Sequence, residues 1–534
     1  MSSGVLSSTG VRSPATPAEP TRSAPIRSHR DAALLGLLVG SITACNLIWT
    51  SRDSHRLYWD FARHLGNSIS YKDEFTISHP LRFFTTYLYP NPPFVYWMTD
   101  VFYGLFGTDL WVAILSNVVF LAVLVFAVYG IGTLLWSPRV GLLSAVFVVT
   151  SPMFVTQLKW YMLDVPLSAM VALALYLLIR SDNFARRRSS LLLGVAVGVG
   201  MLTKWPFAFF LALPAAVGVG TALVRARRER AVTGLVNVSA AGLIAFAIAS
   251  VWYIPNLGSF TRDLGVATNV PPSVMDAPDV GSLSSWLWYF WDLVNNGLYL
   301  LPFLFLVVGV VFLLRKDESA AKLTPLVLSV VGGYLAFSSL ALKDFRYVMP
   351  MIPSVAVIAT HWLDYLKPTR RRWLAALLAT YGVLMFFVIS FGTSVLPRQI
   401  TIPIKARSFT SNILNFIPPE SKRVTGVVVF AQHGFIVGKP SSQEWYQDTV
   451  FKEIDSRSHG ATFWYSGPAD QLWFQTWGIR YYALRYRARW VAYPQQAQFL
   501  IVRGAVPRGV TRGFVELKRY RLPYSGPLRL YERV

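Results

Sequence analysis

Cysteine is almost absent from this chain, since Cys45 is the only one among 534 residues. A single thiol can form neither an internal disulfide nor a zinc cluster. The sequence also has no glycine-rich phosphate-loop fingerprint, so nothing in it supports an ATP-driven pump.

Charged residues are also scarce, at 14% of the sequence, whereas hydrophobic residues make up 54%. This balance is typical of a polytopic membrane protein. Apolar runs close to the roughly 20 residues that cross hydrocarbon recur from Ala32 to Leu396. We predict eleven transmembrane helices, at residues 32–50, 111–135, 140–158, 161–180, 190–203, 205–224, 235–256, 293–314, 323–342, 347–366 and 373–396.

The positive charge is unevenly placed and predicts the topology. With a cytoplasmic N-terminus, the basic clusters at 186–188, 225–230, 315–322 and 367–372 all fall inside, as the positive-inside rule requires. Merging the fifth and sixth runs would place the first two clusters on opposite sides. The sequence therefore predicts a multi-pass protein of the inner (plasma) membrane with its C-terminus outside. The net charge of +23 does not indicate a nucleic acid partner, because the apolar runs exclude a soluble basic module.

The membrane region is expected over residues 31–396, after a disordered cytoplasmic arm at 1–30 that is rich in Ser, Pro and Arg. Two exterior loops, 51–110 and 257–292, are rich in aromatic residues. Aromatic rings settle at the level of the lipid headgroups, so short helices lying on the membrane are predicted there. The fold class is an all-α polytopic membrane domain.

Residues 397–534 are expected to form a soluble extracytoplasmic α/β domain. Their short β-type runs include VTGVVVFAQHGFIV, QFLIVRGAV and LRLYERV, and a helix is predicted near residues 470–484. This segment has 20 Lys plus Arg against 8 Asp plus Glu, a net charge of +12. It either contacts anionic headgroups or an anionic polymer, or has a basic surface without a dedicated ligand.

Several ionisable residues recur at the exterior ends of the predicted spans. An ionised group costs roughly 2.5 to 3.5 kcal/mol at the bilayer centre, so such groups usually face protein or water. Each has an ordinary structural interpretation as well: a carboxylate can cap a helix, a lysine can reach the headgroups, and an arginine can pair with a neighbour such as Asp344. Their common depth favours a site. The candidates are Asp53, His55, Asp60, Asp164, Lys204 and Arg346.

At this point the sequence resembles a known group. The ordered motifs PPFVYW, MLDVPLSAMVALALYLL, LTKWP, WYIP and RYVMPMIP look like those of the protein mannosyltransferase and lipid A aminoarabinose transferase relatives of the glycosyltransferase C superfamily. The resemblance covers residues 45–365. It implies an integral membrane glycosyltransferase that moves a sugar from a polyprenyl-phosphate donor to a lipid, glycan or protein acceptor, with inversion at the anomeric carbon.

The resemblance also implies roles for the candidate residues. The acid in the first loop would be catalytic; Asp53 is the preferred match and Asp60 competes with it. Asp164 matches the second acid of the family. Lys204 and Arg346 match family cations, which suit a departing phosphate. The predicted catalytic residues are Asp53 and Asp164, and the predicted substrate-binding residues are Lys204, Arg346, His55 and Asp60.

Three questions stay open in the sequence. Aminoarabinose transferases have a lysine before the paired prolines of the first loop, where this chain has Asn91. Lys72, Arg82 and Lys204 are the candidates to take its place. The sequence identifies no definite cofactor, but His55 with Asp53 and Asp164 would offer ligands for a divalent metal. The alternative functions are a transporter or flippase of a lipid-linked or anionic substrate and an inactive scaffold.

Overall fold

The computed structural model describes residues 29–55, 57, 59–74, 82–88, 90–268, 278–403, 426–433, 437–467, 476–505, 509–522 and 526–534. Of the arm predicted at 1–30, all but the last two residues lie outside this set, as does the middle of the exterior segment at 269–277.

A helix lies at each of the eleven predicted spans. The helices are α1 (His29–Arg52), α5 (Leu110–Leu135), α6 (Pro138–Thr150), α7 (Pro152–Gln157), α8 (Asp164–Arg180), α9 (Arg187–Thr203), α10 (Phe207–Arg228), α11 (Thr233–Thr268), α13 (Leu300–Arg315), α14 (Asp317–Ser338), α15 (Ile352–Thr360) and α16 (Pro368–Phe391). Six helices in the described part of the chain, α1, α5, α10, α11, α14 and α16, are long and apolar enough to cross a membrane. The mostly helical class is confirmed, and the full count of eleven spans stays a prediction.

Two predicted spans are interrupted by proline. The run at 140–158 breaks at Ser151, where Pro152 starts α7, because proline has no N–H to continue the ladder of α6. The run at 347–366 consists of the 3₁₀ helix η3 (Phe345–Met351), α15 and a second 3₁₀ helix, η4 (His361–Tyr365). Both breaks shorten the α-helical stretch available for spanning.

The outer surface of the bundle is apolar. On α11, Val236, Leu243 and Phe246 are 62%, 70% and 65% exposed. Large apolar surfaces of this kind are rare in water-soluble proteins. They are the ordinary surface of a helix that faces lipid.

The two segments predicted to be exterior loops contain short helices. The first holds α2 (Trp59–Glu74), α3 (Arg82–Thr85) and α4 (Phe94–Phe106), and the second holds α12 (Leu283–Asp292), which continues into the π-helical turn η2 (Leu293–Leu298). The paired prolines that follow Asn91 separate α3 from α4.

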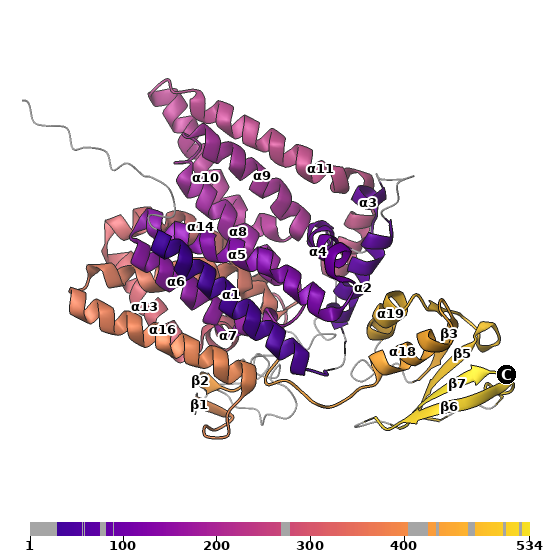
Figure 1. Ribbon diagram of the computed structural model, residues 1–534. Coiled ribbons are helices and arrows are strands. Elements are labelled where there is room, and N and C mark those ends of the chain that lie inside the picture. The colour runs from indigo at the N-terminus through magenta and orange to yellow at the C-terminus, as the bar shows by residue number, and fades with distance from the viewer. Residues whose placement is uncertain are drawn as a thin grey trace, which may run out of the picture.

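The C-terminal region carries two sheets at one end of the bundle (Figure 1). Strands β1 (Gln399–Pro403) and β2 (Gly426–Ala431) form an antiparallel pair. The second sheet is mixed and has the order β4-β3-β5-β7-β6, with β3 parallel to β4 and β5. Its members and flanking helices are α18 (Gln447–Arg457), β3 (Thr462–Ser466), α19 (Thr476–Arg485), β4 (Arg489–Trp490), β5 (Phe499–Arg503), β6 (Phe514–Tyr520) and β7 (Leu528–Arg533). An independent extracytoplasmic domain at 397–534 remains a prediction.

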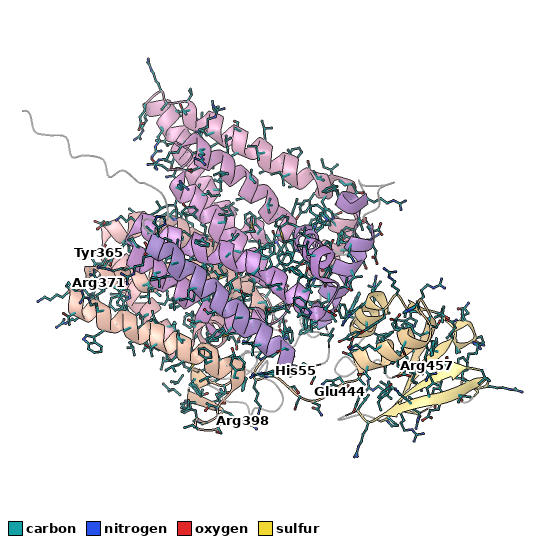
Figure 2. All side chains as sticks on the ribbon, in the orientation of Figure 1. His55, Tyr365, Arg371, Arg398, Glu444 and Arg457 are labelled. Atoms are coloured by element: carbon teal, nitrogen blue, oxygen red, sulfur yellow. The ribbon has the colours of Figure 1, made fainter. Side chains whose placement is uncertain are left out.

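Helix α19 packs against α2, so the C-terminal region touches the first exterior loop. A Cβ on Gly478 would come 2.4 Å from the carbonyl oxygen of Leu57, so only glycine allows this approach. The backbone N–H of Leu57 donates to Gln447 Oε1 at 2.9 Å, and Gln447 Nε2 donates back to the Leu57 carbonyl at 3.3 Å. Nearby, His55 lies between the end of α1 and the C-terminal sheet (Figure 2).

Glycines of α9 permit close packing with α11. A Cβ on Gly194 would lie 2.5 Å from the Ala241 carbonyl oxygen, whereas one on Gly242, the next residue of α11, would meet nothing within 4 Å.

We predict that Gly194→Ala destabilises the protein by about 1 to 3 kcal/mol because the helices must separate. Gly242→Ala, the matched control, should be neutral or slightly stabilising, because alanine favours a helix. Thermal unfolding in detergent measures both, and equal midpoints would contradict this account of the packing.

Candidate functional site

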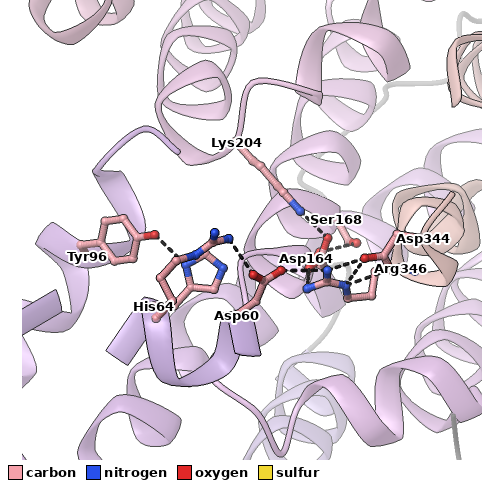
Figure 3. Close-up of polar contacts among 9 residues, drawn as sticks. Asp60, His64, Tyr96, Asp164, Ser168, Lys204, Asp344 and Arg346 are labelled. Atoms are coloured by element: carbon pink, nitrogen blue, oxygen red, sulfur yellow. Dashed lines mark hydrogen bonds and ion pairs between the residues drawn. The ribbon is translucent and has the colours of Figure 1, made fainter. Parts of the chain in front are cut away.

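Arg346 joins carboxylates from three distant parts of the chain (Figure 3). Its Nη2 lies 2.9 Å from Asp60 Oδ2, and its Nη1 lies 3.9 Å from Asp164 Oδ2. Its Nε donates to both oxygens of Asp344, at 2.9 and 3.0 Å. The side chain of Arg346 is only 8% exposed, so these ion pairs are held away from bulk water.

Each charged group is positioned by the end of a helix. Asp60 and Asp164 lie in the first turns of α2 and α8, where the positive end of the helix dipole favours a carboxylate. Asp344 caps η3 by accepting the backbone N–H of Arg346 at 3.0 Å. Lys204 follows the last residue of α9. Turns between helices therefore bring the charges together at one end of the bundle.

Asp164 is buried and unequally paired. Its side chain is 1% exposed, and Oδ1 accepts from Lys204 Nζ at 2.7 Å. Its other oxygen, Oδ2, has no hydrogen-bond partner among the described residues and only the long ion pair with Arg346.

Asp60 is the more exposed of the two carboxylates that line the cavity, with a side chain 19% exposed against 6% for Asp344. Its Oδ1 lies 2.6 Å from Arg63 Nη2, one turn further along α2. Burial acts to raise the pKa of Asp60, but Arg346 and Arg63 outweigh it and hold this pKa below its usual range. Asp60 is therefore an ionised carboxylate at neutral pH.

These charges border a cavity with an empty space of about 1080 Å³, its open mouth included. Its lining combines aromatic and apolar residues with charged ones. The lining residues are Trp59, Asp60, Arg63, His64, Pro90, Asn91, Lys204, Trp205, Pro206, Phe337, Leu340, Leu342, Asp344, Arg346 and Tyr347. Of the three proposed substitutes for a lysine at Asn91, Lys204 lines this cavity, and Lys72 and Arg82 are not among its lining residues.

Two cavity residues, Arg63 and His64, were missed from the sequence. They follow Asp60 at the i+3 and i+4 positions of α2, a spacing that places side chains on one helix face. That spacing was the available signal. His64 is 3% exposed, and its Nδ1 shares a hydrogen bond of 2.7 Å with the Tyr96 hydroxyl.

Asp53 and His55 do not join this cluster, which corrects the geometry expected for them. Asp53 Oδ1 accepts the backbone N–H of Ser441 at 2.9 Å and contacts His55 Nδ1. Asp53 thus fastens the end of α1 to the C-terminal region, and His55 pairs with Asp53. The catalytic role of Asp53 stays a prediction, and the geometry favours Asp60 as the acid of the first loop.

The metal site considered for Asp53, His55 and Asp164 is likewise not assembled. Within the part of the chain that the structure describes, no three His, Cys, Asp or Glu side chains are grouped so that they could hold a metal ion. The charges around Asp164 are instead compensated by Lys204 and Arg346.

Comparison with known proteins agrees with this architecture. Residues 90–254, which include Asp164 and Lys204, match the family described as dolichyl-phosphate-mannose-protein mannosyltransferase. The fold is shared with the crystal structure of ArnT from Cupriavidus metallidurans bound to undecaprenyl phosphate, with a TM-score of 0.61 and 14% identity over 94% of this chain and 98% of that one. The apo form of that protein gives a TM-score of 0.57. The fold is therefore that of a polytopic membrane protein of the ArnT type.

Two curated relatives extend the likeness in sequence. An uncharacterized protein of Aquifex aeolicus (strain VF5) is 27% identical over 316 residues, which are 56% of this chain and 60% of that relative. The undecaprenyl phosphate-alpha-4-amino-4-deoxy-L-arabinose arabinosyl transferase of Yersinia pestis (strain Pestoides F) is 24% identical over 369 residues, or 67% of this chain and 63% of that relative. The chain is thus similar to the protein mannosyltransferases and aminoarabinose transferases of the glycosyltransferase C superfamily, which confirms the resemblance seen in its motifs.

The buried histidine of the site should make stability depend on pH. Burial, with a further contribution from Arg63, lowers the pKa of His64 well below its usual value. Below about pH 6.5 the unfolded chain therefore binds a proton that the folded protein does not, and stability falls as the pH falls, by up to about 1.4 kcal/mol per pH unit.

His64→Gln should reduce the fall in stability between pH 7 and pH 5, measured as the midpoint of thermal unfolding. His459→Gln is the control, because the His459 side chain is 88% exposed. If His64→Gln keeps the pH dependence of the wild type, His64 is not the group that causes it.

Proposed function

We propose that this protein is a membrane glycosyltransferase that moves a sugar from a polyprenyl-phosphate donor to a lipid, glycan or protein acceptor. The observation that carries the proposal is one cavity that holds an ionised carboxylate, Asp60, beside the cations Lys204 and Arg346. Sugar transfer from a lipid phosphate needs both: a base for the acceptor proton and positive charge for the departing phosphate.

Lys204 and Arg346 are the groups suited to the donor phosphate. Both already hold carboxylates, at 2.7 Å from Asp164 Oδ1 and 2.9 Å from Asp60 Oδ2. An incoming phosphate presents the same kind of anionic oxygen, and Arg346 offers a planar fork for it. The charge that stabilises the leaving group is thus in place before the donor arrives.

Asp60 is the group suited to the acceptor. In the resting site Arg346 and Arg63 keep its pKa low, which makes it a weak base. A phosphate that shares Arg346 would withdraw part of that stabilisation and raise the basicity of Asp60. Donor binding would then activate the base, so the acceptor proton would be removed only when a sugar is ready to be transferred. Asp164 is not among the lining residues, and its part in the proposal is to hold Lys204 Nζ, at 2.7 Å, beside the cavity.

The remaining walls suit the sugar and its lipid. Trp59, Trp205 and Tyr347 line the cavity with aromatic surface against which a pyranose ring can pack. Phe337, near the end of α14, and Leu340 line the cavity, and on α14 the apolar side chains of Val331 and Leu335 are 39% and 48% exposed. A polyprenyl chain lying along this apolar path would bring its phosphate to Lys204 without leaving the bilayer.

The finer topology belongs to the same proposal: about eleven spans, a cytoplasmic N-terminus and an extracytoplasmic site at the inner membrane. The region 397–534 supports the site through the packing of α19 on α2, and its net positive charge suits an anionic acceptor or headgroup. Among the described residues, no observation favours the transporter alternative.

The choice of base can be tested directly. Asp60→Asn should lower transfer from a radiolabelled polyprenyl-phosphate sugar by about 10² to 10⁴-fold, the usual contribution of a general base. Asp53→Asn is the matched control and should retain most of the rate, because Asp53 lies at the C-terminal attachment. Wild-type rates in Asp60→Asn, with loss in Asp53→Asn, would reverse the assignment.

The roles of Lys204 can be separated by pairing variants. Lys204→Gln leaves the buried carboxylate of Asp164 without its partner and should cost about 3 to 5 kcal/mol of stability. The double variant Asp164→Asn with Lys204→Gln removes both charges and should recover much of that stability. Transfer should remain lost in the double variant, since the phosphate cation is still missing. Recovery of transfer together with stability would mean that Lys204 serves only to neutralise Asp164.

A further inference from the structure

A second hollow lies between α6 and α16, away from the charged cluster. It has an empty space of about 940 Å³, open solvent included. Its floor is apolar: Leu142, Leu143 and Val146 of α6 face Ala375, Ala376 and Ala379 of α16. The three alanines repeat with helical spacing, so one face of α16 has no large side chains to fill the space between the helices. We call this hollow the α6–α16 groove.

One end of the α6–α16 groove is cationic. Arg139, Arg371 and Arg372 lie there with a single carboxylate, Asp364, which pairs with Arg371 at 3.5 Å. The lining therefore has two positive charges in excess. Arg139 belongs to the first turn of α6 and the other two arginines to the first turns of α16, so all three share one level, where the starts of two helices also favour an anion.

The α6–α16 groove is complementary to an amphiphilic molecule, because its lining is charged at one end and apolar along the two helices. Figure 2 shows Arg371 at the end of α16 remote from the C-terminal sheets. Arg371 and Arg372 belong to the cluster at 367–372 that the charge pattern places on the cytoplasmic side, and Arg139 lies between the second and third predicted spans, which the same topology places on that side. The groove is thus separate from the proposed transfer site, and binding in the groove does not depend on the proposed sugar transfer.

We propose that the α6–α16 groove binds one anionic phospholipid of the cytoplasmic leaflet. Arg139 and Arg372, whose side chains are exposed, take the headgroup phosphate, while Arg371 stays paired with Asp364. An acyl chain lies against Ala375 and Ala379. The charge complementarity selects an anionic lipid over a zwitterionic one, whose headgroup has no net negative charge.

Native mass spectrometry of the full chain in detergent tests this with phosphatidylglycerol and phosphatidylcholine. The wild type should retain phosphatidylglycerol at least about tenfold more tightly, since charge-assisted contacts are the strongest hydrogen bonds available to a headgroup. The double variant Arg139→Gln with Arg372→Gln should reduce that preference to near unity. Ala379→Leu fills the channel without altering charge and should weaken both lipids.

The matched control is Arg187→Gln with Arg228→Gln, which removes two exposed arginines from the predicted cytoplasmic ends of α9 and α10. This pair should leave the preference unchanged, and thermal unfolding checks that every variant is folded. Equal retention of the two lipids by the wild type would overturn the proposal. An equal loss of the preference in the control pair would also overturn it, because general surface charge would then explain the binding. A protein helix that occupies the groove and is displaced by Ala379→Leu would overturn it as well.

Discussion

The ion pairs of Arg346 are the constraint on which the rest of the site depends. One guanidinium contacts carboxylates from α2, from the start of α8 and from the cap of η3. Leaving a buried charge without its partner costs several kcal/mol, so the helices that carry these groups must stay in register. The same requirement keeps the cavity open. Closing it would separate the ion pairs among its charged lining residues. Stability and the capacity to bind an anion thus come from the same contacts.

Much of the architecture could be predicted because it is local. Hydropathy and charge located a helix at every predicted span, and Asp164, Lys204 and Arg346 were singled out because an ionisable group is expensive in an apolar segment. The choice between Asp53 and Asp60 could not be made in this way. It depends on Ser441, nearly 390 residues further along the chain, which binds Asp53 and leaves Asp60 to the cavity. Arg63 and His64 were missed although their spacing from Asp60 was visible, because the sequence did not show where α2 begins.

The two ends of the bundle have different chemistry. At one end, three acids and three bases neutralise one another around a space for a substrate. At the other, the α6–α16 groove has an excess of positive charge, a distribution that favours a permanently anionic surface. Helix α6 connects these regions, because its C-terminal break at Ser151 leads through α7 to Asp164. A lipid fixed beside α6 would therefore restrain the element that precedes the buried acid.

The packing of α19 on α2 also has a consequence for biosynthesis. Helix α2 leaves the ribosome early, whereas α19 follows about 400 residues later, so the helix that carries Asp60 lacks its support while the membrane helices are being inserted. The site can reach its final geometry only when the chain is nearly complete. Under the proposed function, a nascent protein would then be unable to consume lipid-linked sugar, and truncated products would be inert instead of partly active.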